Sequence, residues 1–138
     1  MVSTPAPFTA TPCNRFFGFE LRHRTADRVE VELTVRPDFL QEEGVVHGGV
    51  LTALADTAAV YLLWPELPPD RGMTGIECKM NFLAAALPGP EPLRAIATPL
   101  RKGSTIAVCE SVVQQGTRVV AKGTFTFLLR TRDQAPPR

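Results

Sequence analysis

Hydrophobic and polar residues alternate along much of the chain, and this alternation predicts β-strands. In residues 29–35, valine or leucine stands at every second position, with glutamate or threonine between them. A period of two is typical of a strand with one buried face. Five further runs are candidate strands: residues 16–24, 74–83, 93–100, 104–115 and 118–129.

One long segment has a different pattern. Residues 48–64 are rich in alanine and leucine and are apolar on nearly every side, which predicts a helix that is buried all round. A membrane span is the alternative. However, 17 residues are close to the minimum for a span, and Asp56 near the midpoint would cost about 2.5–3.5 kcal/mol in a bilayer. We therefore expect a helix inside a protein core, which Pro65 ends.

The order of elements predicts the fold class. Two strands, one apolar helix and four strands follow one another, and short connections favour antiparallel neighbours. A helix buried on all sides must be wrapped by the sheet. We therefore expect an α+β fold, with a curved antiparallel sheet around one central helix. Residues 1–15 are expected to form a loose N-terminal arm, residues 16–130 one domain, and residues 131–138 a disordered tail.

Composition narrows the class of protein. A chain of 138 residues with 44% hydrophobic and 21% charged residues fits one soluble domain. Its net charge of +1 lacks the basic excess of a nucleic-acid binder. Three widely spaced cysteines predict reduced thiols rather than disulfides or a metal site. Because the first residues resemble no signal peptide, we expect a cytoplasmic protein that needs no metal or organic cofactor and binds neither nucleic acid nor membrane.

Asp56 is the first candidate for chemistry. It is the only charged residue in the helical segment, and the residues three and four positions away include no cation. A carboxylate in such surroundings is costly to desolvate and tends to have a raised pKa, and perturbed carboxylates concentrate at functional sites. The alternative interpretation is that Asp56 faces a solvent gap and only keeps the helix soluble.

The tripeptide His47-Gly48-Gly49 stands where the helix begins. The first N–H groups of a helix lack internal partners and lie at its positive end, so they can polarise a carbonyl group or bind an anion. Glycine also lets a ligand approach the backbone closely. The alternative interpretation is a tight turn in which the His47 side chain caps the helix or packs against it.

Three further positions carry groups that can bind a ligand. Gln41, six residues before the histidine, can donate a hydrogen bond to a carbonyl, and Thr74 can hold a water molecule or a carboxylate. Arg101-Lys102-Gly103, in a predicted loop, can contact phosphates. Each also has a simpler interpretation: a solvated surface residue, an ordinary strand start and a solvated turn.

Together these residues resemble the hotdog-fold acyl-CoA thioesterases of the PaaI-like family, the phenylacetate-pathway type. The family signature is a helix that opens with HGG and carries an acidic residue nine positions after the histidine. Residues 45–60, VVHGGVLTALADTAAV, are close to this pattern in full. The resemblance covers roughly residues 16–129. One departure follows Phe82, where many relatives have Arg-Pro and this chain has Leu83-Ala84.

The resemblance implies a role for each matching residue. Asp56 would act as a base toward water or as a nucleophile on the thioester. The Gly48 N–H would polarise the thioester carbonyl next to His47, Gln41 would supply the family's side-chain amide, and Thr74 would position water. Arg101, Lys102 and Gly103 would contact the CoA of the substrate.

The implied function is hydrolysis of an acyl-CoA, with an aromatic, short or medium acyl group, to the free acid and CoA. The alternative is a hotdog protein that binds acyl-CoA without catalysis. The resemblance also implies a homodimer, or a homotetramer built as a dimer of dimers. In such a dimer, Asp56 of one subunit would face Gln41 and Gly48 of the other.

Overall fold

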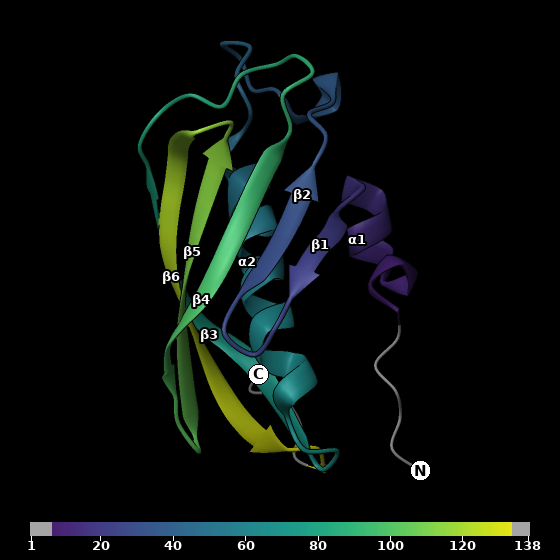
Figure 1. Cartoon of the computed structure of the whole chain (residues 1–138), viewed down its shortest axis with the longest axis vertical. Helices are drawn as coiled ribbons and strands as arrows, with labels where there is room; N and C mark the ends of the chain where they lie inside the picture. Colours follow the sequence, from purple (N-terminus) through teal and green to yellow (C-terminus); the bar gives the residue numbers. More distant parts are fainter. Residues whose placement is uncertain (1–6, 134–138) are drawn as a thin grey trace.

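The computed structural model describes residues 7–133. One six-stranded antiparallel sheet curves around the long helix α2 (Gly48–Leu63) (Figure 1). The strand order is β1-β2-β4-β5-β6-β3. The strands are β1 (Glu20–Arg24), β2 (Val29–Leu33), β3 (Arg71–Phe82), β4 (Leu93–Lys102), β5 (Ile106–Gln115) and β6 (Arg118–Thr131). The predicted α+β fold with one central helix is confirmed.

The core lies between α2 and the concave face of the sheet. Strand β2 shows the predicted alternation, because Val29, Val31 and Leu33 are buried while the glutamates between them lie on the outer face. The helix packs mainly against β2, β4 and β5. Leu54 and Leu62 of α2 are fully buried in this contact.

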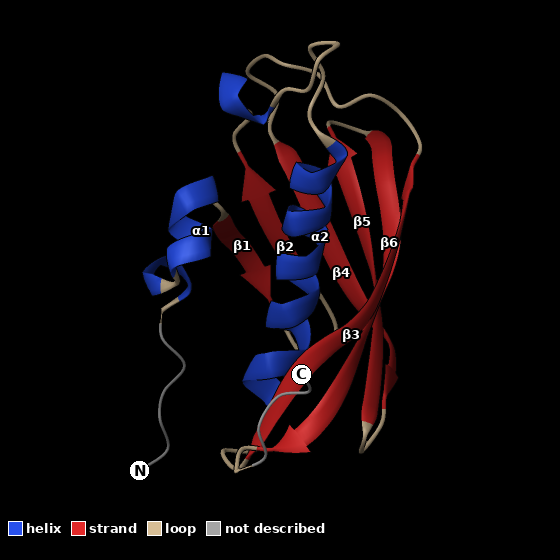
Figure 2. Cartoon of the chain, turned by 180° about the vertical axis from the view of Figure 1, so that it is seen from behind, coloured by secondary structure: helices blue, strands red, loops and turns tan. Residues whose placement is uncertain are grey.

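The helix is not buried all round, which corrects the sequence prediction. Leu51, Leu54, Ala58 and Leu62 face the sheet, but Gly49, Ala53, Asp56 and Val60 are partly or fully exposed. These exposed residues recur every three or four positions, so they form one stripe along α2. Figure 2 views this side of the helix, which the sheet leaves open except where β3 crosses it. We call these four residues the open stripe of α2. A single sheet covers only one side of the helix, so burial of the whole circumference would need a second layer.

The start of the chain is more ordered than predicted. Residues Phe8–Ala10 form a 3-10 turn, and residues Pro12–Phe17 form the short helix α1 where the sequence predicted a loose arm and then a strand. Proline stands at the first turn of α1, and Gly18 with a φ of 77° ends it. Hydrogen bonds to Tyr61 of α2 hold the segment in place. Residues 1–6 of the expected arm and 134–138 of the expected tail lie outside the described residues.

Several strands are longer than the sequence pattern indicates. Strand β3 begins at Arg71, β4 continues through Lys102, and β6 reaches Thr131. These extensions are paired in register with their neighbours: Arg71 lies opposite Thr131, and Lys102 opposite Ala107. Backbone pairing therefore prolongs the strands beyond the apolar alternation.

None of the helices within residues 7–133 has the length and apolarity that crossing a bilayer requires.

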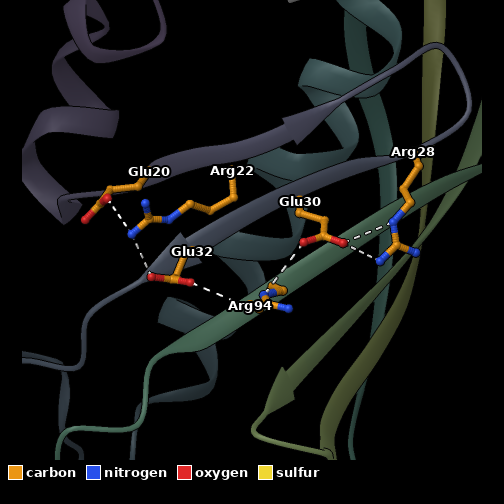
Figure 3. A network of polar contacts seen from close by, with 6 residues as sticks. All are labelled: Glu20, Arg22, Arg28, Glu30, Glu32 and Arg94. Atoms are coloured by element: carbon orange, nitrogen blue, oxygen red, sulfur yellow. Dashed lines mark hydrogen bonds and ion pairs between the residues drawn. The ribbon is translucent and has the colours of Figure 1, made fainter.

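The two edges of the sheet differ in character. Strand β1 is short, and Arg22 bridges Glu20 at 2.8 Å and Glu32 of β2 at 3.0 Å. The network continues across the outer face through Arg94 of β4, Glu30 and Arg28 (Figure 3). Charged residues of this kind protect a sheet edge from pairing. Strand β3 is 12 residues long, and its residues Ile76 and Phe82 are 51% and 56% exposed. The β3 edge therefore exposes apolar side chains beside the charged Glu77 and Lys79, and no strand of the described residues pairs with it.

Gly123 holds β3 close to β6, and we predict that Gly123→Ala destabilises the fold. A Cβ at this position would lie 2.2 Å from Sδ of Met80 and 2.6 Å from the backbone oxygen of Lys79. Because the second contact is with backbone, β3 must shift, and we expect a loss of about 1–3 kcal/mol in the free energy of unfolding. Denaturant midpoints measure this loss. At Gly72 a Cβ would have only ordinary contacts, the nearest at 3.5 Å, so Gly72→Ala is the matched control. Equal midpoints for the two variants would contradict the prediction.

Candidate active site

The loop before α2 is held firmly at both ends. The N–H of His47 donates to the carbonyl of Phe39 at 2.8 Å, and the N–H of Val46 donates to the carbonyl of Ala86 at 2.9 Å. Leu40 and Val46 form an isolated β-bridge. These contacts tie the start of α2 to the segment that follows β3. The helix N-terminus is therefore built into the fold.

The side chain of His47 caps the helix, as one of the two sequence interpretations proposed. Its Nδ1 accepts a hydrogen bond from the N–H of Gly49 at 2.8 Å. The N–H of Val50 donates to the carbonyl of His47. Within residues 7–133, the N–H of Gly48 has no such partner. Of the first three N–H groups of α2, the one from Gly48 is therefore left to bind a ligand at the positive end of the helix.

Gly48 and Gln41 line the same cleft, of about 430 Å³. The Oε1 of Gln41 accepts a hydrogen bond from the N–H of Glu43. Its Nε2 has no acceptor among the described residues, so the amide can donate to a ligand. The ring of Phe82 comes within 3.0 Å of the position that a Cβ on Gly48 would take. Position 48 therefore needs glycine for close packing as well as for access to the N–H.

Asp56 lies on the open stripe, in the middle of α2. It lines two clefts of about 400 and 510 Å³, both of which also contain Gly75 of β3 and Phe127 of β6. The neighbouring hydroxyls of Thr52 and Thr57 donate to helix carbonyls. Among residues 7–133, no group forms a hydrogen bond or an ion pair with the carboxylate of Asp56. The carboxylate is thus available to a ligand in either cleft.

The surroundings of Asp56 disfavour its charge. Although the side chain is open to solvent on one side, packed helix and sheet atoms remove water on the others, and this desolvation raises the pKa of the carboxyl above its ordinary value of 3.8. The buried thiol of Cys109 lies beneath the same part of the helix. Burial and the charge of Asp56 raise the pKa of Cys109 to about 12, so this thiol stays neutral. A carboxylate with a raised pKa is suited to accept a proton.

One chain does not bring Gly48 and Asp56 to the same carbonyl group. They are eight residues apart on α2, which separates them by about 12 Å along the helix axis. The first N–H groups of a helix point away from its body, so a carbonyl bound by Gly48 lies still further from Asp56. The two groups also line different clefts. The structure therefore brings Gln41 and Gly48 together and leaves Asp56 apart from them.

Thr74 does not reach the carboxylate in this structure. Its Oγ1 accepts a hydrogen bond from Nε of Arg130 at 3.0 Å. Its neighbours Met73 and Gly75 line the cleft beside Asp56, and successive side chains of a strand point to opposite faces. Thr74 thus lies on the outer face of the sheet, and Gly75 takes the position next to Asp56. Counting residues from Asp56 could not detect this difference of one position.

The predicted CoA contacts lie elsewhere as well. Arg101 and Lys102 belong to the end of β4 rather than to a loop, and Gly103 starts the turn into β5. Lys102 donates to the carbonyl of Ala26 in the β1–β2 turn. None of the three lines a cleft that contains Asp56 or Gly48. Within the described residues, no group of three or more histidine, cysteine or acidic side chains could hold a metal ion.

Among the lining residues that the predicted site did not include, two have a clear structural role. Phe82 ends β3 against Gly48, and Asn14 of α1 lines one cleft of Asp56. The spacing of Pro12 and Gly18 was a usable signal for α1, because proline favours helix starts and glycine favours helix ends. No local signal shows which surface α1 covers.

Comparison with known proteins shows the family to which this chain belongs. The sequence pattern of the thioesterase superfamily matches residues 43–122. A protein named "Putative esterase" from Deinococcus radiodurans is 34% identical over 82% of this chain and 73% of its own length. The chain belongs to the thioesterase superfamily.

Two solved structures share the fold of this chain. A conserved protein from Pseudomonas aeruginosa has a TM-score of 0.82 and 27% identity over 92% of this chain and all of its own. A mutant of the phenylacetic acid degradation protein PaaI from Thermus thermophilus has a TM-score of 0.78 and 26% identity, over 85% of this chain and 97% of its own. The fold is the hotdog fold, and the resemblance to PaaI proteins is confirmed.

We predict that the side chain of His47 serves the helix rather than the chemistry. His47→Ala removes the acceptor for the N–H of Gly49 and should cost about 1 kcal/mol of unfolding free energy. His47→Asn supplies another side-chain acceptor and should restore most of that stability. Denaturation of the three proteins measures the effect. Loss of enzymatic activity in a fully stable His47→Asn protein would contradict this assignment.

The raised pKa of Asp56 predicts a pH-dependent effect on stability. A carboxyl whose pKa is higher in the folded state favours folding when protonated, and this contribution is lost as pH rises through the folded-state pKa. Asp56→Asn should therefore be more stable than the natural protein at neutral pH, and the difference should shrink as pH falls toward 3.8. Chemical denaturation across this range measures it. Asp27→Asn, in the exposed β1–β2 turn, is the control, and a difference for Asp56→Asn that is independent of pH would refute the prediction.

Proposed function

We propose that this member of the thioesterase superfamily hydrolyses acyl-CoA thioesters to the free acid and CoA. The observation that carries the proposal is the position of Asp56. It is a carboxylate without a partner among the described residues, it has a raised pKa, and it lies between two clefts on the open stripe of α2. The match of residues 43–122 to the thioesterase superfamily supports a thioester substrate.

The proposed chemistry assigns one role to each group. As a base, Asp56 takes a proton from the water that attacks the thioester carbonyl carbon. As a nucleophile, its carboxylate attacks that carbon, and water then hydrolyses the resulting anhydride to the free acid and restores Asp56. The N–H of Gly48 and the amide of Gln41 donate hydrogen bonds to the carbonyl oxygen, where negative charge develops. Each donor of this kind typically lowers the barrier by about 2.7–4 kcal/mol. The carbon–sulfur bond then breaks, and CoA leaves as its thiolate.

We further propose that the active site is shared between two subunits. Three features of the single chain support this. The two functional halves are about 12 Å apart along α2, the open stripe is uncovered, and the long β3 edge is unpaired. Pairing of two β3 edges would continue the sheet and bring Asp56 of one subunit to Gly48 and Gln41 of the other. Such a dimer, or a tetramer of two dimers, completes the site.

The function is tested with Asp56→Asn. The natural protein should release free thiol from acyl-CoA substrates, measured with a thiol reagent over aromatic, short-chain and medium-chain acyl groups. Asp56→Asn keeps the size of the side chain but removes the base, so kcat should fall by roughly 10²–10⁴-fold while KM changes little. Asp27→Asn should keep full activity. If the natural protein binds acyl-CoA and releases no thiol, the protein is a binding module and the proposed hydrolysis is refuted.

The shared site is tested by complementation. We expect Asp56→Ala to be inactive and Gln41→Ala to be impaired, and co-expression of the two gives mixed dimers. Random assortment makes half of the dimers mixed, and each of these has one intact site, so about a quarter of all sites should work. A site built from one chain would carry a lesion in every copy. Activity no higher than the mean of the two separate mutants would therefore exclude a shared site.

A further inference from the structure

One wall of the cleft at Gly48 and Gln41 belongs to the connection between β3 and β4. Ala86 of this connection lines the cleft and is only 1% exposed. Residues 83–92 form no helix or strand, and three of the last five are prolines, which have no N–H to donate. The position of this wall therefore depends on hydrogen bonds from other parts of the protein.

The side chain of Gln115 supplies these hydrogen bonds. Gln115 is the last residue of β5 and is only 7% exposed. Its Oε1 accepts from the N–H of Leu87 at 2.8 Å, and its Nε2 donates to the carbonyls of Leu87 at 2.8 Å and Glu91 at 3.1 Å. Within residues 7–133, the backbone of residues 87–91 forms hydrogen bonds with no other residue. One buried amide thus anchors the connection.

The peptide group between Ala86 and Leu87 is held at both of its ends. Its N–H, which belongs to Leu87, donates to Gln115. Its carbonyl, which belongs to Ala86, accepts the N–H of Val46 at 2.9 Å. Because a peptide group is planar, a contact that fixes the direction of the N–H also fixes the direction of the carbonyl. Gln115 therefore aims the carbonyl of Ala86 at the loop before α2.

The next peptide group continues this contact to Gln41. The N–H of Val46 and the carbonyl of Val45 belong to one peptide group, and that carbonyl accepts the N–H of Gln41 at 2.8 Å. Three hydrogen bonds in series thus connect the side chain of Gln115 with the backbone of Gln41. Hydrogen bonds in such a chain polarise and strengthen one another. The chain passes two residues before Gly48, so both proposed donors depend on it.

We propose that Gln115 is a positioning residue of the active site, which holds Gln41 and the N–H of Gly48 in place for the carbonyl oxygen of the substrate. This inference rests on the proposed function, which gives these two donors their role. Gln115 lines none of the three clefts at the donors and at Asp56, so it acts through the loop. Displacement of a group in an active site by about 1 Å can lower the rate by about 10²-fold.

Hydrogen exchange in the natural protein tests the chain without any substitution. The N–H groups of Leu87 and Val46 lie outside the helices and strands, yet both should exchange at least about 100-fold more slowly than an unbonded amide. Ala85 is exposed, and its N–H has no partner among the described residues, so it is the internal reference. Equal protection of the three amides, measured by NMR, overturns the proposal.

A substitution then tests whether Gln115 controls the loop. Gln115→Met keeps the length of the side chain and removes its hydrogen-bonding groups, so exchange at Val46 should accelerate at least about 10-fold. Exchange at Leu54, in the core of α2, should stay unchanged. Gln114→Met, at the half-buried neighbouring position, is the matched control. Unchanged exchange at Val46, or equal acceleration at Leu54, overturns the proposal. The measurement on the natural protein stands whether or not Gln115→Met folds.

Kinetics distinguish positioning from a loss of stability. With the best substrate of the acyl-CoA panel, Gln115→Met should lower kcat about 10–100-fold and change KM little, because the donors act on charge that develops in the transition state. In a Gln41→Ala background the same substitution should lower kcat by a smaller factor, since one of the positioned donors is already missing. Equal factors in the two backgrounds contradict action through the Gln41 loop.

Thiol release by the natural protein separates this inference from the proposed function. Thiol release together with an unchanged kcat in Gln115→Met keeps the hydrolase function and refutes the role of Gln115. Absence of thiol release refutes hydrolysis, and binding of butanoyl-CoA then takes the place of kcat. In that case Gln115→Met should weaken the affinity about 3–10-fold, as expected for a hydrogen bond to the ligand carbonyl that is lost or misaligned. Equal affinities overturn the positioning role.

Discussion

The packing of α2 against the concave face of the sheet controls the rest of this structure. Leu54, Ala58 and Leu62 are fully buried in that contact, and burial of one large apolar side chain typically contributes about 1.5–3 kcal/mol. These contacts fix the rotation of the helix about its axis. Asp56 must then face away from the sheet. Burying its charge in the core would cost more free energy than a rotated helix could recover through new apolar contacts. The position of the carboxylate is a consequence of the core.

The same helix presents a second functional group at its end. Its first N–H groups have no partners inside the helix, and the surrounding loop decides which of them stays available. His47 binds the N–H of Gly49, and the backbone carbonyl of His47 binds that of Val50. Gly48 is left facing a cleft, next to the ring of Phe82. By binding the N–H groups of Gly49 and Val50, His47 thus leaves the N–H of Gly48 as the available donor.

The distance between Gly48 and Asp56 along α2 is the main constraint on the proposed function. A carboxylate in the middle and a donor at the end cannot meet at one carbonyl group, because the helix holds them about 12 Å apart. The two edges of the sheet fit the proposed pairing of two subunits. The β1 edge carries the charged network of Figure 3, whereas the long β3 edge beside Asp56 is unpaired and exposes Ile76 and Phe82. A single chain with these features holds both halves of the proposed site without bringing them together.

The sequence by itself determined the strands, the central helix and the candidate site residues. Alternation in β2 and β5, the apolar helix and the HGG motif nine positions before Asp56 are local patterns, and local patterns report which residues are strand, helix or cap. A curved antiparallel sheet around one helix and the candidate residues Asp56, Gly48 and Gln41 followed from them, and the resemblance to the PaaI-like family implied the hotdog fold. The structure was needed wherever the outcome depended on contacts between distant segments. It placed Thr74 on the outer face and Gly75 beside Asp56, because pairing with β6 sets which side of β3 faces inward. It placed Arg101 and Lys102 away from the clefts, because β4 continues to pair with β5 there. It also brought Asn14 against Tyr61, 47 positions along the chain. Periodicity identifies a buried face, but only packing decides which residues meet across it.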